Sequence, residues 1–334
     1  MNFRYLSLGL LILGLAGCGA PPTNSSNTKP GNPEVSSSPT ANKPVVVVSY
    51  SVLCDLTQQI AQDTINLKCL MPAGQDPHTY QPTPDDRKSI DTSALVLYGG
   101  YEFEAQVIKL VKASGNTETK VAVHEIAVPK PLMGEHEHAP GEAKSDKPDA
   151  KEADPHVWHN AKNGIAIVQV IQDKLTKLAP QNSVLYAKNA TALRDRLTKV
   201  DAWIQGSIAT IPAASKKLVT THDALSYYGE AYGLPIEGAL QGISTDEKPT
   251  ASRVKALVDE IKRSKVPTIF AEITASPKLI ETVAKEANVK LASKSLFADG
   301  LGEPGSRADR YDKMLISNTT TIVEGLGGTL TPAP

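Results

Sequence analysis

The sequence predicts an α/β protein of two lobes, each a small, mostly parallel sheet flanked by helices, joined by one long rigid helix. Short apolar, β-branched segments alternate with helix-like segments along two successive stretches of the chain. This alternation is typical of parallel sheets that helices cover on both faces. A long helical segment without Pro or Gly before Gly206 separates the two stretches.

Each half of the chain contains four expected strands. In the first half we expect strands at 45–50, 67–71, 94–98 and 120–124, with helices at 53–62, 85–91 and 104–113. In the second half we expect strands near 217–221, 235–239, 268–271 and 290–293, with helices near 224–232, 252–264, 277–287 and 309–326. The N-terminal lobe is therefore expected at 44–178 and the C-terminal lobe at 215–330.

The segment between the lobes is expected to be a linking helix at 180–210. Apolar residues recur at helical spacing through 181–207, and Pro180 and Pro212 bracket this segment. About 26 helical residues extend about 40 Å, roughly the height of a domain. A coiled-coil dimer helix is the alternative, but the apolar seam is too short for sustained heptads. We therefore expect a strut within a monomeric protein.

The first 18 residues have the pattern of a secretory signal. Arg4 provides a positive charge, residues 6–16 form a short apolar run, and Leu-Ala-Gly precedes Cys18. The run is too short for an ordinary membrane span. Its end resembles a bacterial lipobox, in which the Cys is lipidated and anchors the protein outside the cytoplasm without a transmembrane helix; a plain signal peptide is the alternative. Residues 19–43, rich in Ser, Pro, Asn and Thr, are expected to be a disordered tether.

Cysteine content, charge and one polar segment bear on the compartment and the partners. With Cys18 assigned to lipid, Cys54 and Cys69 remain as a pair, which suggests a disulfide in an oxidising compartment; two free buried thiols are the alternative. The formal net charge of −1 argues against a nucleic-acid partner. The charged segment 131–153 is expected to be a mobile surface loop, in which His136 and His138 form a possible auxiliary metal site or are incidental.

Candidate metal ligands stand in four loops, three of which follow expected strands. The segments are Asp76-Pro77-His78, Asp154-Pro155-His156, His222-Asp223 and Asp299-Gly300. In α/β sheets, ligands bind outside the carboxyl ends of the strands. Successive candidates lie roughly 65 to 80 positions apart, unlike the local ligands of a zinc finger or a His-Glu-x-x-His helix. We therefore expect the metal in the cleft between the lobes, where imidazole and carboxylate ligands suit zinc, and also manganese or iron.

Three of the candidate ligands also have a structural interpretation. The alternative for His78 is a turn residue after Pro77, for His222 a core histidine, and for Asp299 a helix N-cap. Asp76 and Asp154 are expected to cap their turns or to hold the histidine rings in place.

The four segments, together with Val157-Trp158-His159-Asn160 and Leu301-Gly302, resemble the cluster A-I solute-binding lipoproteins of metal-ion ABC transporters, which are zinc and manganese receptors. The likeness covers essentially the whole mature chain. It implies two α/β lobes joined by a long helix, and metal ligands at His78, His156, His222 and Asp299. It also implies an ABC permease and its ATPase subunit as partners, and a binding protein rather than an enzyme.

The third ligand favours zinc, Zn²⁺, as the captured ion. Manganese receptors of this family usually have Glu at the position of His222, and oxygen-rich ligand sets suit manganese; because Asp299 supplies oxygen, Mn²⁺ stays the alternative. A zinc-dependent hydrolase is the alternative from another class, with Glu272 and Glu303 as candidate bases, although a strand end and a loop explain these two residues equally well. Catalytic zinc, however, keeps an open position. No His-Glu-x-x-His motif or nucleophile elbow is present in the sequence. A surface adhesin, a role ascribed to relatives, has no specific support in the residues.

Overall fold

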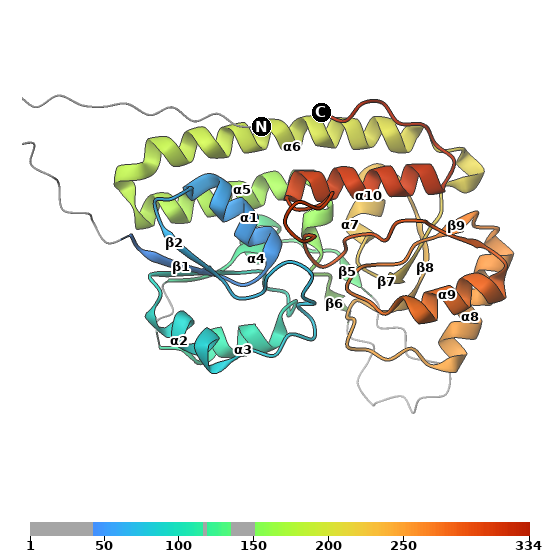
Figure 1. Ribbon diagram of the computed structural model, residues 1–334, viewed down its shortest axis with the longest axis horizontal. Helices are drawn as coiled ribbons and strands as arrows, with labels where there is room; N and C mark the ends of the chain where they lie inside the picture. The colour runs from blue at the N-terminus through green and yellow to red at the C-terminus, as the bar shows by residue number, and fades with distance from the viewer. Residues whose placement is uncertain (1–42, 116–118, 135–150) are drawn as a thin grey trace, which may run out of the picture. The chain divides into compact units, whose positions relative to one another are not determined.

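The computed structural model describes residues 43–115, 119–134 and 151–334. The predicted lipobox with Cys18, the tether up to residue 42, and the pair His136 and His138 lie outside the described residues. Within the described part the predicted α/β class is confirmed, because parallel sheets are flanked by helices and one long helix runs along both halves (Figure 1).

The N-terminal sheet has four parallel strands in the order β2-β1-β3-β4. Its strands and helices are β1 (Val45–Val48), α1 (Ser51–Ala61), β2 (Asn66–Cys69), α2 (Pro84–Thr92), β3 (Leu95–Tyr98), α3 (Ala105–Ala113), β4 (Lys120–Ala122) and α4 (Val123–Ala127). The inner strand β1 consists of four consecutive Val residues, of which Val46, Val47 and Val48 are fully buried. A strand that is apolar on both faces is what a parallel sheet covered by helices on both sides requires.

The C-terminal lobe repeats this plan with shorter strands. Its elements are β7 (Leu218–His222), α7 (Ser226–Tyr232), β8 (Ile236–Gln241), α8 (Ala251–Ser264), β9 (Thr268–Ile269), α9 (Pro277–Ala287), β10 (Lys290–Leu291) and α10 (Tyr311–Gly325). Strand β7 pairs in parallel with β8, and β9 with β10. The backbone N–H of Phe270 donates to the Val219 carbonyl at 2.9 Å, which brings β9 beside β7. The resulting order β8-β7-β9-β10 corresponds to β2-β1-β3-β4.

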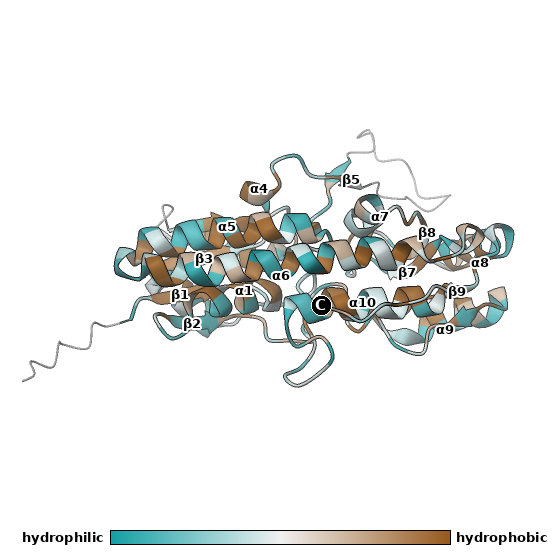
Figure 2. Ribbon diagram, turned by 90° about the horizontal axis from the view of Figure 1, so that it is seen from above, coloured by the Kyte–Doolittle hydropathy of each residue, from teal (hydrophilic) through white to brown (hydrophobic). Residues whose placement is uncertain are grey.

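Three helices pack together along one side of the two lobes. Helix α5 (Ala161–Leu178) and helix α6 (Ser183–Ala209) form a hairpin through the 3-10 turn Pro180–Asn182, and α6 also packs on α1 and α10. Figure 1 shows α6 running past both lobes, and Figure 2 shows it with α5 on one side and α10 on the other. Polar and apolar residues alternate along α6 in Figure 2, as expected for a helix with one buried side. This helix is the predicted strut.

Helix α5 is absent from the sequence prediction. Near its first turn it contains Gly164, where a Cβ would lie 2.2 Å from the Tyr311 hydroxyl. Glycine weakens the local helix signal but permits this close packing. The strand predicted at 120–124 is longer than the observed one: β4 ends at Ala122, and His124 lies in α4. The expected loop 131–153 carries a short antiparallel pair, β5 (Met133–Gly134) with β6 (Glu152–Ala153).

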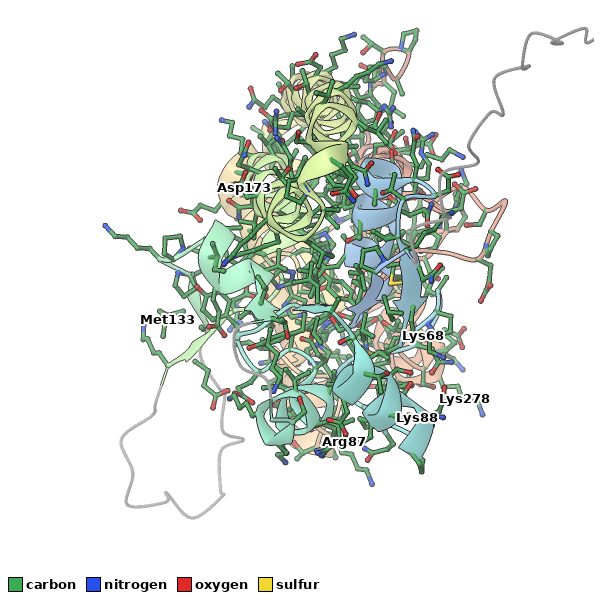
Figure 3. All side chains as sticks on the ribbon, turned by 90° about the vertical axis from the view of Figure 1, so that its left-hand side faces the viewer. Lys68, Arg87, Lys88, Met133, Asp173 and Lys278 are labelled. Carbon is green, nitrogen blue, oxygen red and sulfur yellow. A yellow bond between two sulfur atoms is a disulfide. The ribbon has the colours of Figure 1, made fainter. Side chains whose placement is uncertain are left out.

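The outer surface is charged and the interior is apolar. The labelled side chains of Lys88, Asp173 and Lys278 point away from the ribbon in Figure 3, and all three residues are exposed. Exposed ion pairs contribute only about 0 to 1 kcal/mol each, so the apolar core that passes through both lobes and α6 is the main source of stability. Among the residues described, no helix combines the length and the apolar character needed to cross a bilayer.

Candidate metal centre

Four side chains from the two lobes converge on one point. His78, His156, His222 and Asp299 each offer one ligand atom, and these atoms all lie within 4.8 Å of one another. The Oδ1 atom of Asp299 lies 3.1 Å from Nε2 of His222, 3.4 Å from Nε2 of His156 and 3.6 Å from Nε2 of His78. The Nε2 atoms of His78 and His156 are 3.3 Å apart.

The four separations of 3.1 to 3.6 Å are close to those in a tetrahedral shell around a single ion, and the whole set lies within 4.8 Å. Zinc binds imidazole nitrogen and carboxylate oxygen at about 2.0 to 2.2 Å, so tetrahedral ligand atoms lie roughly 3.3 to 3.6 Å apart. The His78 side chain is 4% exposed, whereas those of His156, His222 and Asp299 are fully buried. Buried polar groups are costly unless they are paired or coordinate a metal. The arrangement therefore has the chemistry of an enclosed site for one divalent cation.

Two Asp-Pro-His turns present the first two histidines. In the first turn, Asp76 Oδ1 accepts the backbone N–H of His78 at 3.0 Å. In the second, Asp154 Oδ1 accepts the backbone N–H of His156 at 2.9 Å and also contacts its ring Nδ1 at 2.8 Å. Asp side chains that bond the backbone two residues on stabilise tight turns. Both Asp residues thus cap their turns, and Asp154 also orients a ring.

The other two members of the centre come from the C-terminal lobe. His222 ends β7, and its Nδ1 contacts Oε2 of Glu272. The Oε1 atom of Glu272 accepts the backbone N–H groups of Thr221 and His222 at 3.2 Å each. Asp299 follows β10 in the chain, and its Oδ2 accepts a hydrogen bond from the Thr274 hydroxyl at 2.7 Å. This bond leaves Oδ1 of Asp299 facing the histidines.

The loop that carries Asp299 is held against the N-terminal lobe. A Cβ on Gly300 would lie 2.7 Å from Ser51 Oγ, so a larger residue would push the loop away from α1. Ser51 Oγ also accepts the backbone N–H of Leu301 at 2.9 Å. The absence of a Cβ at Gly300 therefore allows the two lobes to lie close enough for all four side chains to meet.

Two further histidines beside the centre have structural roles. His159 Nε2 lies 2.8 Å from the Ala298 carbonyl, and His124 Nε2 lies 2.9 Å from the Tyr50 hydroxyl. Burial, reinforced by the nearby charge of His156, lowers the pKa of His124 and of His159 to about 3. Both rings are therefore neutral at physiological pH and bridge neighbouring segments of the core.

The carboxylates shift the protonation of the histidines that they face. Burial tends to lower the pKa of His222, but Asp299 and Glu272 outweigh it and raise the pKa well above its usual value. Burial likewise opposes protonation of His156, and Asp154 and Asp299 raise its pKa. Burial tends to raise the pKa of Asp299, but the facing histidines hold it well below its usual value. Without a cation, protons on the rings balance the buried negative charge.

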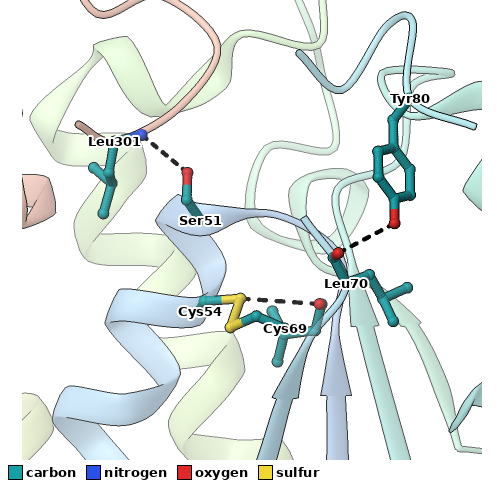
Figure 4. The surroundings of a disulfide bond; sticks show 7 residues. Ser51, Cys54, Cys69, Leu70, Tyr80 and Leu301 are labelled. Atoms are coloured by element: carbon teal, nitrogen blue, oxygen red, sulfur yellow. Dashed lines mark hydrogen bonds between the residues drawn. A yellow bond between two sulfur atoms is a disulfide. The ribbon is translucent and has the colours of Figure 1, made fainter. Parts of the chain in front are cut away.

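A disulfide joins Cys54 in α1 to Cys69 at the end of β2, with Cα atoms 6.0 Å apart. Figure 4 shows the bridge between the helix and the sheet. Immediately beyond it, the Tyr80 hydroxyl donates to the Leu70 carbonyl at 3.2 Å (Figure 4). The bridge therefore anchors the strand that leads into the His78 turn.

The sequence prediction considered Glu272 only as a candidate base of a hydrolase, and it did not identify the side chains that hold the proposed ligands in the C-terminal lobe. Glu272 is 50 positions from His222, and Thr274 is 25 positions from Asp299. No local motif marks either residue. The one available signal is that both follow the expected strand 268–271, at the edge of the sheet where α/β proteins bind ligands.

Comparisons with known proteins identify the family. A family model described as zinc-uptake complex component A, periplasmic (ZnuA), matches residues 46–325. The metal ABC transporter substrate-binding lipoprotein FimA of Streptococcus parasanguinis is 34% identical over 297 residues, which are 87% of this chain and 92% of FimA. The manganese ABC transporter substrate-binding lipoprotein PsaA of Streptococcus pneumoniae is 32% identical over 297 residues, which are 87% of this chain and 91% of PsaA.

A solved structure shares the fold. The periplasmic zinc binding protein TroA from Treponema pallidum superposes with a TM-score of 0.76 and 31% sequence identity, covering 85% of this chain and 99% of that one. The family model and the relatives above 30% identity each span most of the chain. This chain therefore belongs to the ZnuA family of metal-binding receptors of ABC transporters.

Proposed function

We propose that the protein captures zinc outside the cytoplasmic membrane through His78, His156, His222 and Asp299 and delivers it to its permease. The observation that carries the proposal is the convergence of three imidazoles and one carboxylate from both lobes, at separations that suit a tetrahedral ion. Three nitrogen ligands favour zinc over manganese, which prefers oxygen. As a solute-binding receptor of this family, the protein is not an enzyme.

The cellular setting follows from the family. Its relatives are named substrate-binding lipoproteins of ABC transporters. The protein is accordingly an extracytoplasmic, membrane-anchored lipoprotein that works with an ABC permease and its ATPase. Lipidation of Cys18 is the proposed means of anchoring, and a monomer stays the predicted oligomeric state.

Manganese is the second candidate ion. Several relatives, among them PsaA, are named manganese receptors, and the Asp299 carboxylate suits either metal. Since zinc binds most sites more tightly than manganese does in vitro, affinity alone does not identify the transported ion.

Two measurements test the proposal. The first is titration of chelator-stripped protein with zinc in competition with a chromophoric chelator, where we expect one tightly bound ion per chain. The second is elemental analysis of protein isolated from its own cell envelope, where we expect zinc. Manganese in the isolated protein would identify it as a manganese receptor, and no tight binding of either ion would refute the site.

A further inference from the structure

We propose that Glu272 is a positioning residue that makes His222 a ligand by holding the proton of its ring on Nδ1. This inference rests on the proposed function and adds a determinant of affinity that lies outside the four ligands. Glu272 is 2% exposed and follows β9, which lies next to β7, the strand that ends in His222.

The position of Glu272 is set by the backbone on both sides of it. The N–H of Leu296 donates to the Ala271 carbonyl at 2.8 Å, and the N–H of Ile273 donates to the Leu296 carbonyl at 3.0 Å. Residues 271 to 273 are thereby tied to the segment around Leu296, three positions before Asp299. The same backbone segment therefore locates both Glu272 and the carboxylate on the opposite side of the His222 ring.

The contacts of the Glu272 carboxylate determine which ring nitrogen is available to a metal. Oε1 accepts two backbone N–H groups, from Thr221 and His222, and Oε2 contacts Nδ1 of His222. An ionised carboxylate only accepts hydrogen bonds, so Nδ1 must carry a hydrogen. In the neutral ring the lone pair is then on Nε2, which lies 3.1 Å from Asp299 Oδ1 and faces the other ligands.

The three histidines differ in this respect. Asp154, which contacts His156 Nδ1, comes from the same turn, two residues away. Within the described part of the chain, Nδ1 of His78 has no hydrogen-bond partner. Of the three, only His222 is oriented by a carboxylate from a distant segment of the chain. Such outer partners fix the tautomer and raise the basicity of a metal-bound imidazole, and their loss typically costs about 10- to 100-fold in metal affinity.

Glu272→Gln separates this role from simple packing. The Gln carbonyl oxygen can still accept the N–H groups of Thr221 and His222, but its NH₂ group then faces Nδ1 of His222. A donor at that place requires Nδ1 to be the acceptor, which moves the ring hydrogen to Nε2 and blocks coordination. We expect zinc affinity to fall by about 10- to 100-fold, with the metal-free protein still folded by circular dichroism. The visible spectrum of bound Co²⁺ should also change, because one nitrogen leaves its coordination shell.

Glu104→Gln is the matched control. Glu104 is also a fully buried glutamate that accepts a backbone N–H, that of Gly99, but it contacts none of the four proposed ligands. We expect zinc affinity and the Co²⁺ spectrum of this variant to match those of the wild type. A Glu272→Gln variant that also matched the wild type in both respects would overturn the proposal. Failure of the wild type itself to bind zinc would instead refute the proposed function.

A measurement on the unaltered protein covers the case in which Glu272→Gln does not fold. In zinc-loaded protein with ¹⁵N-labelled histidine, His222 should show a far-downfield Nδ1–H proton protected from exchange, and its Nε2 should be bound to the metal. A spectrum in which His222 coordinates through Nδ1, or has no hydrogen on Nδ1, would contradict the proposed role of Glu272.

Discussion

The Nε2 atoms of His78 and His156 lie 3.3 Å apart, although the two residues are 78 positions apart in the chain. Each ring is presented by its own Asp-Pro-His turn, and Asp299 Oδ1 lies within 3.6 Å of both Nε2 atoms. The turns alone cannot bring the rings together; the packing of the segments that carry them does.

Replacing His78 or His156 by Ala should remove most of the tight zinc binding, because either change leaves an incomplete shell. Competition titration with a chelator measures the loss. The control is a double change of His136 and His138 to Ala, which alters the possible auxiliary loop and should leave one tight ion per chain. Wild-type affinity in both single variants would show that the metal binds elsewhere.

Zinc binding should release about one proton or more per ion near pH 7.5. Three histidines with an unperturbed pKa of about 6.5 would together release only about 0.3 proton at that pH. The raised pKa of His222 and of His156 keeps protons on the site above pH 6.5. Calorimetry in buffers of different ionisation enthalpy counts these protons, and a release near 0.3 would contradict the raised values.

The same shift predicts how the stability of metal-free protein depends on pH. Because the pKa of His222 is raised on folding, its protonated ring stabilises the fold fully below the unfolded value of about 6.5, and this contribution is lost as pH rises through the folded pKa. His222→Gln should therefore flatten the decline of stability above neutral pH, as followed by denaturant unfolding.

Changing Cys54 and Cys69 together to Ser should destabilise the protein. The bridge spans 15 positions, and the chain-entropy model assigns about 3 kcal/mol to a loop of that length. Urea unfolding of metal-free protein compares the free energies of unfolding, and mass spectrometry checks that the native wild type has no free thiol at these positions. Equal free energies of unfolding for the two proteins would contradict the stabilisation that the chain-entropy model assigns to the disulfide.

His222→Glu should lower the ratio of zinc to manganese affinity, since it exchanges nitrogen for oxygen. The new carboxylate would lie near Glu272, so both affinities should fall, and zinc should still bind more tightly. The ratio is therefore the informative quantity, measured by competition titration with each ion. A ratio that stayed constant or rose would remove His222 from the coordination shell.

Thr245→Val should speed the release of zinc. The Thr245 hydroxyl donates to Asp76 Oδ2 at 2.6 Å, while Asp76 Oδ1 holds the backbone of His78. Removing this bond between the lobes should accelerate dissociation about 3- to 10-fold. Stopped-flow mixing with excess chelator measures the rate. Thr282→Val, which loses only a bond within its own helix, should dissociate at the wild-type rate.

The class of fold and the four members of the centre are readable from the sequence alone. The apolar run Val45–Val48 indicates a strand buried on both faces, and the spacing of apolar residues in Ser183–Ala209 indicates a long helix. Both signals are local patterns in the sequence. The Asp-Pro-His turns are equally local, since Asp76 and Asp154 cap backbone groups only two residues away.

Only the tertiary structure decides which side chains support the four members of the centre. Glu272 reaches His222 across 50 positions and Thr245 reaches Asp76 across 169, and no sequence pattern links the two residues of either pair. Helix α5 is hidden for a related reason, because Gly164 weakens its local signal while serving a contact with Tyr311. Periodicity records what each residue meets within its own element. A contact between a buried carboxylate and a residue of a distant element depends on how separate elements pack. That packing is determined by the whole core at once.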